Sequence, residues 1–371
     1  MSAEADLGDW LRLLLVPGLG RETARRLLTA LGSPREVLNT PDDELSRLLG
    51  PSLAAALRAT PADWAERVDA LYGWLRGASD RSVLLLGDAA YPRSLLESPD
   101  PPLLLHVRGD TAHLSRPAVA VVGSRQPTAQ GREHARDWSR RFAEAGYVVV
   151  SGLAQGIDGA SHEGALAAGG ATVAVVGTGL DRVYPRQHRD LAHRIAEHGA
   201  LVSEYFLGTP PLSENFPQRN RIIAGLAQGT LVVEAALQSG SLITARLANE
   251  AGREVFAVPG SIRAQQSRGC HALIRDGAQL VESADEVLDA LRSPWLPGLA
   301  PAAAPAEAQG PDPEPVDPLL QALGDDPLSA DELQARTGLP AAELLARLLQ
   351  LELDGRVARV PGGLYQRRHS A

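Results

Sequence analysis

Three consecutive segments determine how the central part of this chain folds: Ser213-Glu-Asn-Phe-Pro-Gln-Arg-Asn-Arg-Ile-Ile-Ala-Gly-Leu226, Leu231-Val-Val-Glu-Ala235 and Ser239-Gly-Ser-Leu-Ile-Thr-Ala-Arg246. The second is a buried-strand pattern, and a helical pattern begins directly after Ser239-Gly240-Ser241. Backbone N–H groups and hydroxyls at a helix start hold anions. Arg219 and Arg221 lie close to Phe216, and guanidinium groups with an aromatic ring suit a phosphate that carries a base. The three segments therefore predict a nucleotide or nucleic-acid pocket.

The same alternation of strand and helix patterns extends over a much longer stretch, from about residue 83 to 290. Its continuous apolar runs predict strands that are buried on both faces. Helical patterns between the runs predict right-handed βαβ units. We therefore predict an α/β fold, a Rossmann-like, doubly wound and mostly parallel sheet. Its expected strands are Val83–Leu86, Leu103–Val107, Val119–Val122, Tyr147–Val150, Thr172–Val176, Ala200–Ser203, Thr230–Val233 and Glu254–Val258.

Two smaller domains are predicted to flank this sheet domain, which we place at residues 81–292. Residues 1–80 have helical periodicity, and Val16-Pro-Gly-Leu-Gly20 is typical of the turn in a helix-hairpin-helix or SAM-like domain. Such a turn either offers its N–H groups to a phosphate or simply joins two packed helices, and the sequence favours neither. Residues 293–316 form a predicted Pro/Ala-rich linker, because eight prolines fall between 294 and 318.

Residues 317–371 have the helix, helix, β-hairpin pattern of a winged-helix domain, a variant of the helix-turn-helix. Winged helices bind DNA or protein. The polar positions of the second helix hold Glu343, Arg347, Gln350 and Glu352, a weakly charged set for a helix that reads DNA. We therefore favour a protein-contact role over DNA binding for this domain.

Composition limits the classes of function that this chain can have. Its 371 residues, 44% hydrophobic and 22% charged, predict a globular protein of two or three domains. A net charge of -9 argues against a general polyanion binder, so any DNA site must be a local patch. All 36 basic residues are arginine, which excludes the lysine of a Walker A loop. The single cysteine, the acidic start and the lack of a long apolar run predict a cytoplasmic protein without membrane insertion.

Four expected strands end in loops of small residues, after Val122, Val150, Val176 and Val233. Ligands of an open parallel sheet bind beyond the carboxyl ends of the strands, where such loops expose backbone amides. The dinucleotide fingerprint GxGxxG is absent, and the nine histidines show no metal-ligand spacing. We therefore expect neither a cofactor nor a metal at this edge.

Three residues are candidates for a catalytic role. Asp158 and His162 lie four positions apart at a helix start, hence on one face, but a helix cap explains Asp158 and a structural role is favoured for His162. Glu234 ends a strand and is expected to face the ligand crevice. There it either acts in catalysis or orients Arg219 and Arg221, and the second role is favoured. We expect no catalytic residues.

Taken together, the motifs closely resemble those of the DNA-processing protein A (DprA/Smf) family over essentially the whole chain. One departure is His271, where the family more often has asparagine. The motifs that carry the resemblance are Val121-Val-Gly-Ser-Arg125, Ser151-Gly-Leu-Ala-Gln-Gly-Ile-Asp158, Phe216-Pro-Gln-Arg-Asn-Arg-Ile-Ile-Ala-Gly-Leu226, Glu234-Ala235 with Ser239-Gly-Ser-Leu-Ile-Thr-Ala245, Val258-Pro-Gly260 and Leu273-Ile-Arg-Asp-Gly-Ala278.

The resemblance implies a non-enzymatic, single-stranded DNA-binding protein of natural transformation and homologous recombination. Members of the family protect incoming single strands, load the RecA recombinase onto them and form a homodimer through the Rossmann-like domain. By motif matching, the residues that bind DNA are Gly123, Ser124, Arg125, Ser151, Gly152, Phe216, Arg219 and Arg221, to which we add Ser239, Gly240 and Ser241 at the helix start.

Two other functions remain open. One is a phosphoribohydrolase of the lonely-guy type with Glu234 as its carboxylate, although that family relies on a Pro-Gly-Gly-x-Gly-Thr loop where this chain has Gln238-Ser-Gly-Ser241. The other is a structural adaptor with a vestigial pocket. The sequence also leaves open whether the host uses the protein in transformation or in repair.

Overall fold

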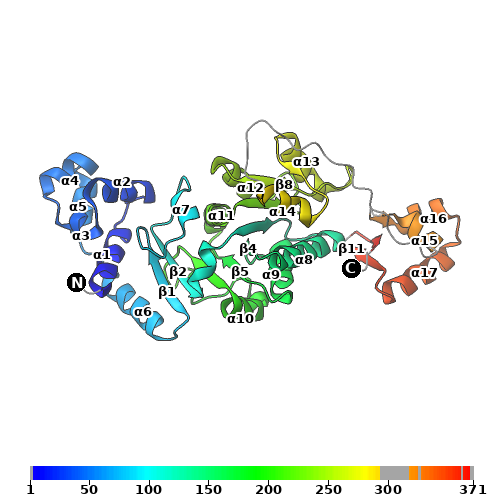
Figure 1. Ribbon diagram of the computed structural model, residues 1–371, viewed down its shortest axis with the longest axis horizontal. Helices are drawn as coiled ribbons and strands as arrows, with labels where there is room; N and C mark the ends of the chain where they lie inside the picture. The colour runs from blue at the N-terminus through cyan, green and yellow to red at the C-terminus, as the bar shows by residue number, and fades with distance from the viewer. Residues whose placement is uncertain (1–2, 293–316, 325–326, 361, 368–371) are drawn as a thin grey trace.

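The computed structural model describes residues 3–292, 317–324, 327–360 and 362–367. A helical domain, a nine-stranded sheet domain and a small winged-helix domain follow one another along the long axis (Figure 1). The linker expected at residues 293–316 lies outside the described residues. Within the described ranges, no helix combines the length and the apolar character needed to cross a bilayer.

The central sheet has the strand order β1-β2-β6-β5-β4-β3-β7-β8-β9. Strands β3 to β9 pair parallel with one another, whereas β1 pairs antiparallel with β2 and β2 pairs antiparallel with β6. The order reverses between β3 and β7, the switch point at which such sheets bind ligands. The strands are β1 (Arg81–Leu85), β2 (Leu104–Gly109), β3 (Ala118–Val122), β4 (Val148–Ser151), β5 (Thr172–Val175), β6 (Ala200–Ser203), β7 (Gly229–Val232), β8 (Glu254–Ala257) and β9 (Gln279–Leu280).

Helices cover both faces of the sheet, because the central strands are apolar on both sides. Val119 and Val121 of β3 pack under one helical layer, and the alternate residues Ala120 and Val122 pack under the other. The first layer holds α8 (Ala129–Glu144), α9 (Ile157–Ala167), α10 (Arg189–His198) and α14 (Ala284–Arg292). The second holds α7 (Arg93–Leu96), α11 (Asn215–Leu226), α12 (Ser241–Glu250) and α13 (Arg268–Arg275). This confirms the predicted doubly wound, mostly parallel fold.

The helical domain packs against the edge of the sheet that β1 forms. Gly18, at a φ of +80°, makes the predicted turn between its first two helices. At the junction with the sheet domain, His106 of β2 lies between the rings of Trp74 and Phe206, with centroid distances of 6.0 and 6.3 Å. The helices are α1 (Ala3–Leu14), α2 (Arg21–Leu31), α3 (Pro34–Asn39), α4 (Asp42–Leu49), α5 (Pro51–Arg58) and α6 (Trp64–Arg76).

The winged-helix domain has its own core of leucines beneath a three-stranded sheet of order β10-β12-β11. It contacts the sheet domain where the side-chain amide of Gln366 donates to that of Gln130 at 2.7 Å. Its elements are α15 (Pro318–Leu323), β10 (Leu328–Ser329), α16 (Ala330–Thr337), α17 (Ala341–Leu353), β11 (Val357–Val360) and β12 (Leu364–Arg367). The predicted winged-helix fold is confirmed.

Candidate nucleic-acid pocket

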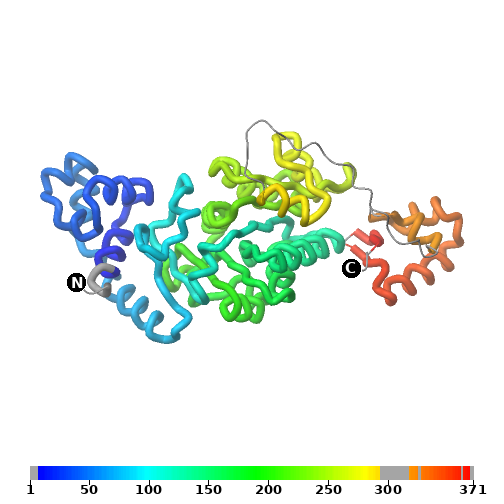
Figure 2. The backbone as a smooth tube through the Cα atoms, in the orientation of Figure 1, coloured from blue at the N-terminus to red at the C-terminus, as the bar shows by residue number. Residues whose placement is uncertain are grey.

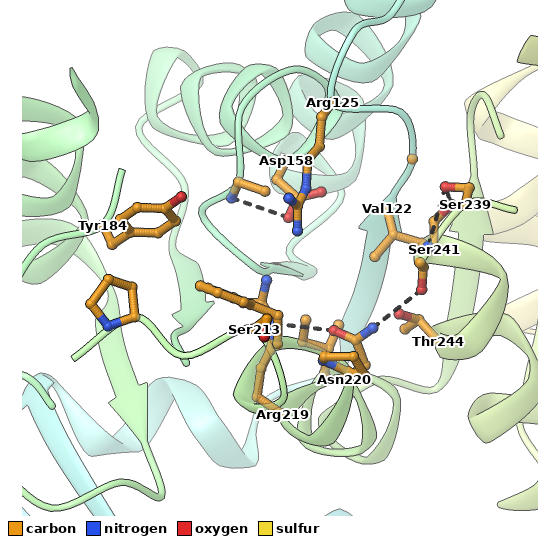
Figure 3. A pocket seen from close by; sticks show the side chains of 17 residues that line it. Val122, Arg125, Asp158, Tyr184, Ser213, Arg219, Asn220, Ser239, Ser241 and Thr244 are labelled. Atoms are coloured by element: carbon orange, nitrogen blue, oxygen red, sulfur yellow. Dashed lines mark hydrogen bonds between the residues drawn. The ribbon is translucent and has the colours of Figure 1, made fainter. Parts of the chain in front are cut away.

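A pocket of about 520 Å³ opens at the switch point, beyond the carboxyl ends of β3, β4 and β7 (Figure 3). Segments from five different strand-to-helix connections converge on it, as expected at the carboxyl ends of parallel strands. It is lined by Val122, Gly123 and Arg125 after β3, Ala154 and Asp158 after β4, Tyr184 before α10, Pro211, Ser213, Phe216, Pro217, Arg219, Asn220 and Ile223 in and before α11, and Ser239, Gly240, Ser241 and Thr244 at the start of α12.

Arg125 and Phe216 form a cation–π pair in this pocket. The guanidinium carbon of Arg125 lies 5.8 Å from the centre of the Phe216 ring. The side chain of Arg125 is exposed and makes neither a hydrogen bond nor an ion pair with any residue that the structure describes. Tyr184 adds a second ring 5.5 Å from that of Phe216, tilted by 39°. The pocket therefore offers an arginine that forms no ion pair with a described residue, beside two aromatic rings.

The start of α12 faces Arg125 across the pocket (Figure 3). The hydroxyls of Ser239 and Ser241 are 2.7 Å apart, and the side-chain amide of Asn220 donates to the carbonyl of Gly240 at 3.3 Å. No acidic residue stands in the first turn of α12. Its positive dipole end is thus directed at the pocket together with two hydroxyls, an arrangement that favours an anion.

Arg219 forms the floor of the pocket and is almost fully buried. Its guanidinium donates to the carbonyl of Gly152 at 2.6 Å and to that of Val175, while Nε donates to the side chain of Asn220 at 3.0 Å. Burial, partly offset by the charge of Asp158, lowers the pKa of Arg219 to about 10, so it stays charged at neutral pH. Arg219 fastens α11 to the ends of β4 and β5 and contributes its positive field to the pocket.

Two of the expected site residues, Ser151 and Gly152, support the pocket without lining it. The hydroxyl of Ser151 is buried and donates to the carbonyl of Val121 at 2.6 Å. The N–H of Gly152 donates to the carboxylate of Asp158 at 3.1 Å, as does that of Ala154 at 3.2 Å. The amides that the sequence suggested for an anion are therefore bound by Asp158, whose pKa is raised by burial.

Ser124 lies in the same loop as Arg125, but it is absent from the lining. Its side chain accepts from the N–H of Gln126 at 3.1 Å and its carbonyl from the N–H of Ile157. His162 is fully buried behind the pocket, with Nδ1 at 2.7 Å from the hydroxyl of Thr172. Both residues have local structural partners.

The structure does not bring Arg221 to the pocket. Its Nε donates to Asp100 at 2.6 Å, and a second nitrogen donates to Glu204. Arg21 and Arg25 of α2 pair with the same carboxylates, so Arg221 belongs to a network that joins the helical domain to the sheet domain. The physical reason is that residues two positions apart on a helix point to different sides of it.

The expectation that Glu234 faces the ligand crevice is wrong. Its side chain neither lines the pocket nor contacts Arg219 or Arg221. Its carboxylate accepts from the N–H of Thr128 at 2.9 Å and from the hydroxyl of the same residue at 2.5 Å. Burial raises the pKa of Glu234. The side chain thus holds the start of α8 in place, a role that the strand-end position did not reveal.

Gly123, Arg125, Phe216, Arg219, Ser239, Gly240 and Ser241 are the expected residues that the structure does bring together. Sequence reasoning missed Tyr184 and Asn220. Tyr184 follows a strand end, but its loop is long, so the position of the ring depends on tertiary packing. Asn220 lies between two arginines, and a neutral amide gives no sequence signal for an anion site. His271, the departure from the family pattern, places Nε2 at 2.9 Å from the carbonyl of Gly260. No cluster of potential metal ligands occurs among the described residues.

Comparisons with family models and with known proteins all find similarity to DprA and Smf proteins. The family model described as DNA recombination-mediator protein A matches residues 82–292, and the DprA winged helix domain matches residues 300–363. Protein Smf of Escherichia coli is 45% identical over 288 residues, which cover 76% of each chain. DNA processing protein DprA of Streptococcus pneumoniae is 49% identical over 201 residues, 54% of this chain and 71% of that protein.

Two solved structures share the fold at more than 30% identity. The structure of DprA from Streptococcus pneumoniae superposes with a TM-score of 0.66 at 35% identity and covers 78% of this chain and 98% of that one. A structure that describes the single-stranded DNA binding mode of DNA processing protein A from Helicobacter pylori gives a TM-score of 0.52 at 31% identity, over 57% of this chain and 95% of that one.

Proposed function

Because this chain belongs to the DNA recombination-mediator protein A (DprA/Smf) family, we propose that it binds single-stranded DNA in the pocket at the switch point of its sheet. The observation that carries the proposal is the pairing of Arg125 with Phe216. A guanidinium without a protein carboxylate suits a phosphate, and an aromatic ring beside it suits the base of the same or the next nucleotide.

The chemistry of the pocket favours single strands of any sequence. Stacking on Phe216 or Tyr184 requires an unpaired base, which a duplex does not expose. The phosphate is held between Arg125 and the start of α12, and neither reads the edges of bases. With a net charge of -9 over the chain, binding depends on this local patch.

We propose a binding role and not a catalytic one, since Glu234, the carboxylate that best fitted an enzyme, is turned to Thr128 and away from the pocket. Family membership supports the wider role: the protein protects single strands and loads a RecA-type recombinase onto them as a homodimer, in transformation or in repair. Sedimentation with and without oligo-dT tests the dimer, and strand exchange by a RecA-type recombinase tests the loading.

The DNA site itself is tested by fluorescence anisotropy of labelled oligo-dT and of a matched duplex over a salt series. The variants are Arg125→Ala and, as a control of equal charge, Arg140→Ala on the exposed side of α8. We expect wild type and Arg140→Ala to prefer the single strand, and Arg125→Ala to lose affinity with a salt slope reduced by about 1. Unchanged binding by Arg125→Ala would place the DNA site elsewhere.

A further inference from the structure

Helix α17 of the winged-helix domain is apolar on two opposite sides. Leu344, Leu348 and Leu351 point into the core of the domain and are buried. Leu345, Leu349 and Leu353 point outward, with exposed fractions of 49%, 57% and 76%. Their spacing of four residues places the three side chains in one stripe along the free side of the helix.

This stripe stands out against the rest of the surface. Ten large hydrophobic side chains are exposed in the described part of the chain, and three of them lie on this one helix. Isolated exposed leucines need no explanation, whereas a contiguous apolar stripe marks a contact surface. Figure 2 shows the winged-helix domain at one end of the molecule, beside the sheet domain, and the exposed fractions of the three leucines show that the sheet domain does not cover the stripe.

The charges around the stripe argue against DNA as the occupant. Glu343, Glu352 and Asp354 stand on the exposed helix or at its end, against a single arginine, Arg347. Arg347 is itself paired with Glu343 at 3.3 Å. In a winged helix that reads DNA, the second helix enters the major groove between two rows of phosphates. A helix with leucines outward and a net negative charge is repelled there.

The same charges argue against a second copy of the helix. If two copies of α17 packed antiparallel about Leu349, Glu343 of one would come next to Asp354 of the other. Like charges at such positions are destabilising. A partner helix that carries lysines or arginines on both sides of an apolar stripe would instead bury the three exposed leucines of α17. Its basic side chains would neutralise Glu343, Glu352 and Asp354, which we call the acidic rim.

We propose that the exposed side of α17 is a docking surface for an amphipathic helix with basic flanks, supplied by a partner protein. The partner presents apolar side chains at i, i+3 or i+4 and i+7, which interdigitate with Leu345, Leu349 and Leu353. The winged-helix domain thus recruits a protein through a surface that is separate from the pocket around Arg125 and Phe216.

The test uses the full chain and a labelled synthetic peptide of leucine and lysine, about 18 residues long, with the leucines at helical spacing. The variant is Leu349→Ser. Leu96→Ser is its matched control, because Leu96 is 54% exposed but stands alone on α7. We expect wild type and Leu96→Ser to bind the peptide alike and Leu349→Ser to bind it about tenfold more weakly by anisotropy. Circular dichroism and oligo-dT binding stay unchanged in both variants.

Equal peptide binding by Leu349→Ser and wild type would overturn the proposal. So would equally tight binding of a peptide with glutamate in place of lysine, because the acidic rim would then have no role. A lower mass of Leu349→Ser in sedimentation, with Leu96→Ser unaffected, would assign the surface to a second copy of the chain. Loss of duplex binding in Leu349→Ser alone would assign it to DNA.

Discussion

Arg219 and Arg221, two positions apart on α11, face opposite sides of the helix and serve different parts of the molecule. Arg219 lies under the pocket at the switch point and holds the ends of β4 and β5. Arg221 binds Asp100 and Glu204, which also pair with Arg21 and Arg25 of α2. Helix α11 is therefore both a wall of the pocket and the surface on which the helical domain is anchored.

Arg221→Ala is expected to destabilise the junction of these domains while sparing the pocket. Loss of the Arg221 guanidinium leaves the partly buried carboxylates of Asp100 and Glu204 with less positive charge beside them. We expect this to lower the free energy of unfolding by about 3 kcal/mol. Thermal unfolding and limited proteolysis measure the loss. Arg93→Ala removes an exposed arginine with an i,i+4 carboxylate and is expected to cost less than about 0.5 kcal/mol. Folded Arg221→Ala that has lost oligo-dT affinity as fully as Arg125→Ala would show that Arg221 binds DNA directly.

The strands and the converging loops of the sheet domain were largely predictable from the sequence. The strands were predictable because the expected runs are mostly continuous apolar segments, and all eight are present. In this sheet only β9 was missed, since two exposed residues, Gln279 and Leu280, carry no pattern. In the winged-helix domain the short strand β10 was also not predicted. Convergence of the loops followed from topology alone, because the carboxyl ends of parallel strands share one edge of a sheet.

The direction in which a polar side chain points was less predictable. Glu234 ends β7 at the crevice edge, but Thr128 offers its carboxylate two donors and turns it aside. Asp158 takes the amides that were expected to bind a phosphate. For Glu234 the partner lies 106 residues away in sequence, and a single sequence does not reveal such a pair. For Asp158 the partners lie only four and six residues away, and the path of the loop decides which amides meet the carboxylate.

Phe216→Ala is expected to weaken oligo-dT binding by about 1–3 kcal/mol, the usual contribution of one stacked base. Phe216→Trp keeps a ring and should retain most of the affinity. Because stacking releases no counterions, the salt slope of Phe216→Ala should equal that of wild type, in contrast to Arg125→Ala. Anisotropy over a salt series measures both quantities. A changed slope in Phe216→Ala would mean that the ring acts mainly by holding Arg125.

His162 predicts a loss of stability in acid. Burial lowers the pKa of His162 to about 3, so the folded state keeps it neutral while the unfolded state takes up a proton below pH 6.5. Protonation of His162 in the unfolded state alone has no effect on stability above pH 7. Between pH 7 and pH 5 it lowers the free energy of unfolding by about 2 kcal/mol. Denaturant unfolding of wild type and His162→Gln at both pH values measures it. The variant should lose correspondingly less stability than wild type over this interval, and an equal loss in both proteins would contradict the assignment.

Gly123→Ala tests the close packing behind the pocket. A Cβ at this position would lie 2.7 Å from Cγ1 of Ile157 and 2.9 Å from the carbonyl oxygen of Glu234, so the loop that carries Arg125 must shift. Overpacking of this kind costs about 1–3 kcal/mol, and displacement of Arg125 should also weaken oligo-dT binding. Gly73→Ala is the control, since a Cβ there meets nothing within 4 Å and alanine favours the helix by up to about 1 kcal/mol. For Gly73→Ala we therefore expect equal or slightly higher stability in thermal unfolding and unchanged oligo-dT affinity in anisotropy. If Gly123→Ala kept both stability and affinity, the loop would not require glycine, and its role in positioning Arg125 would be disproved.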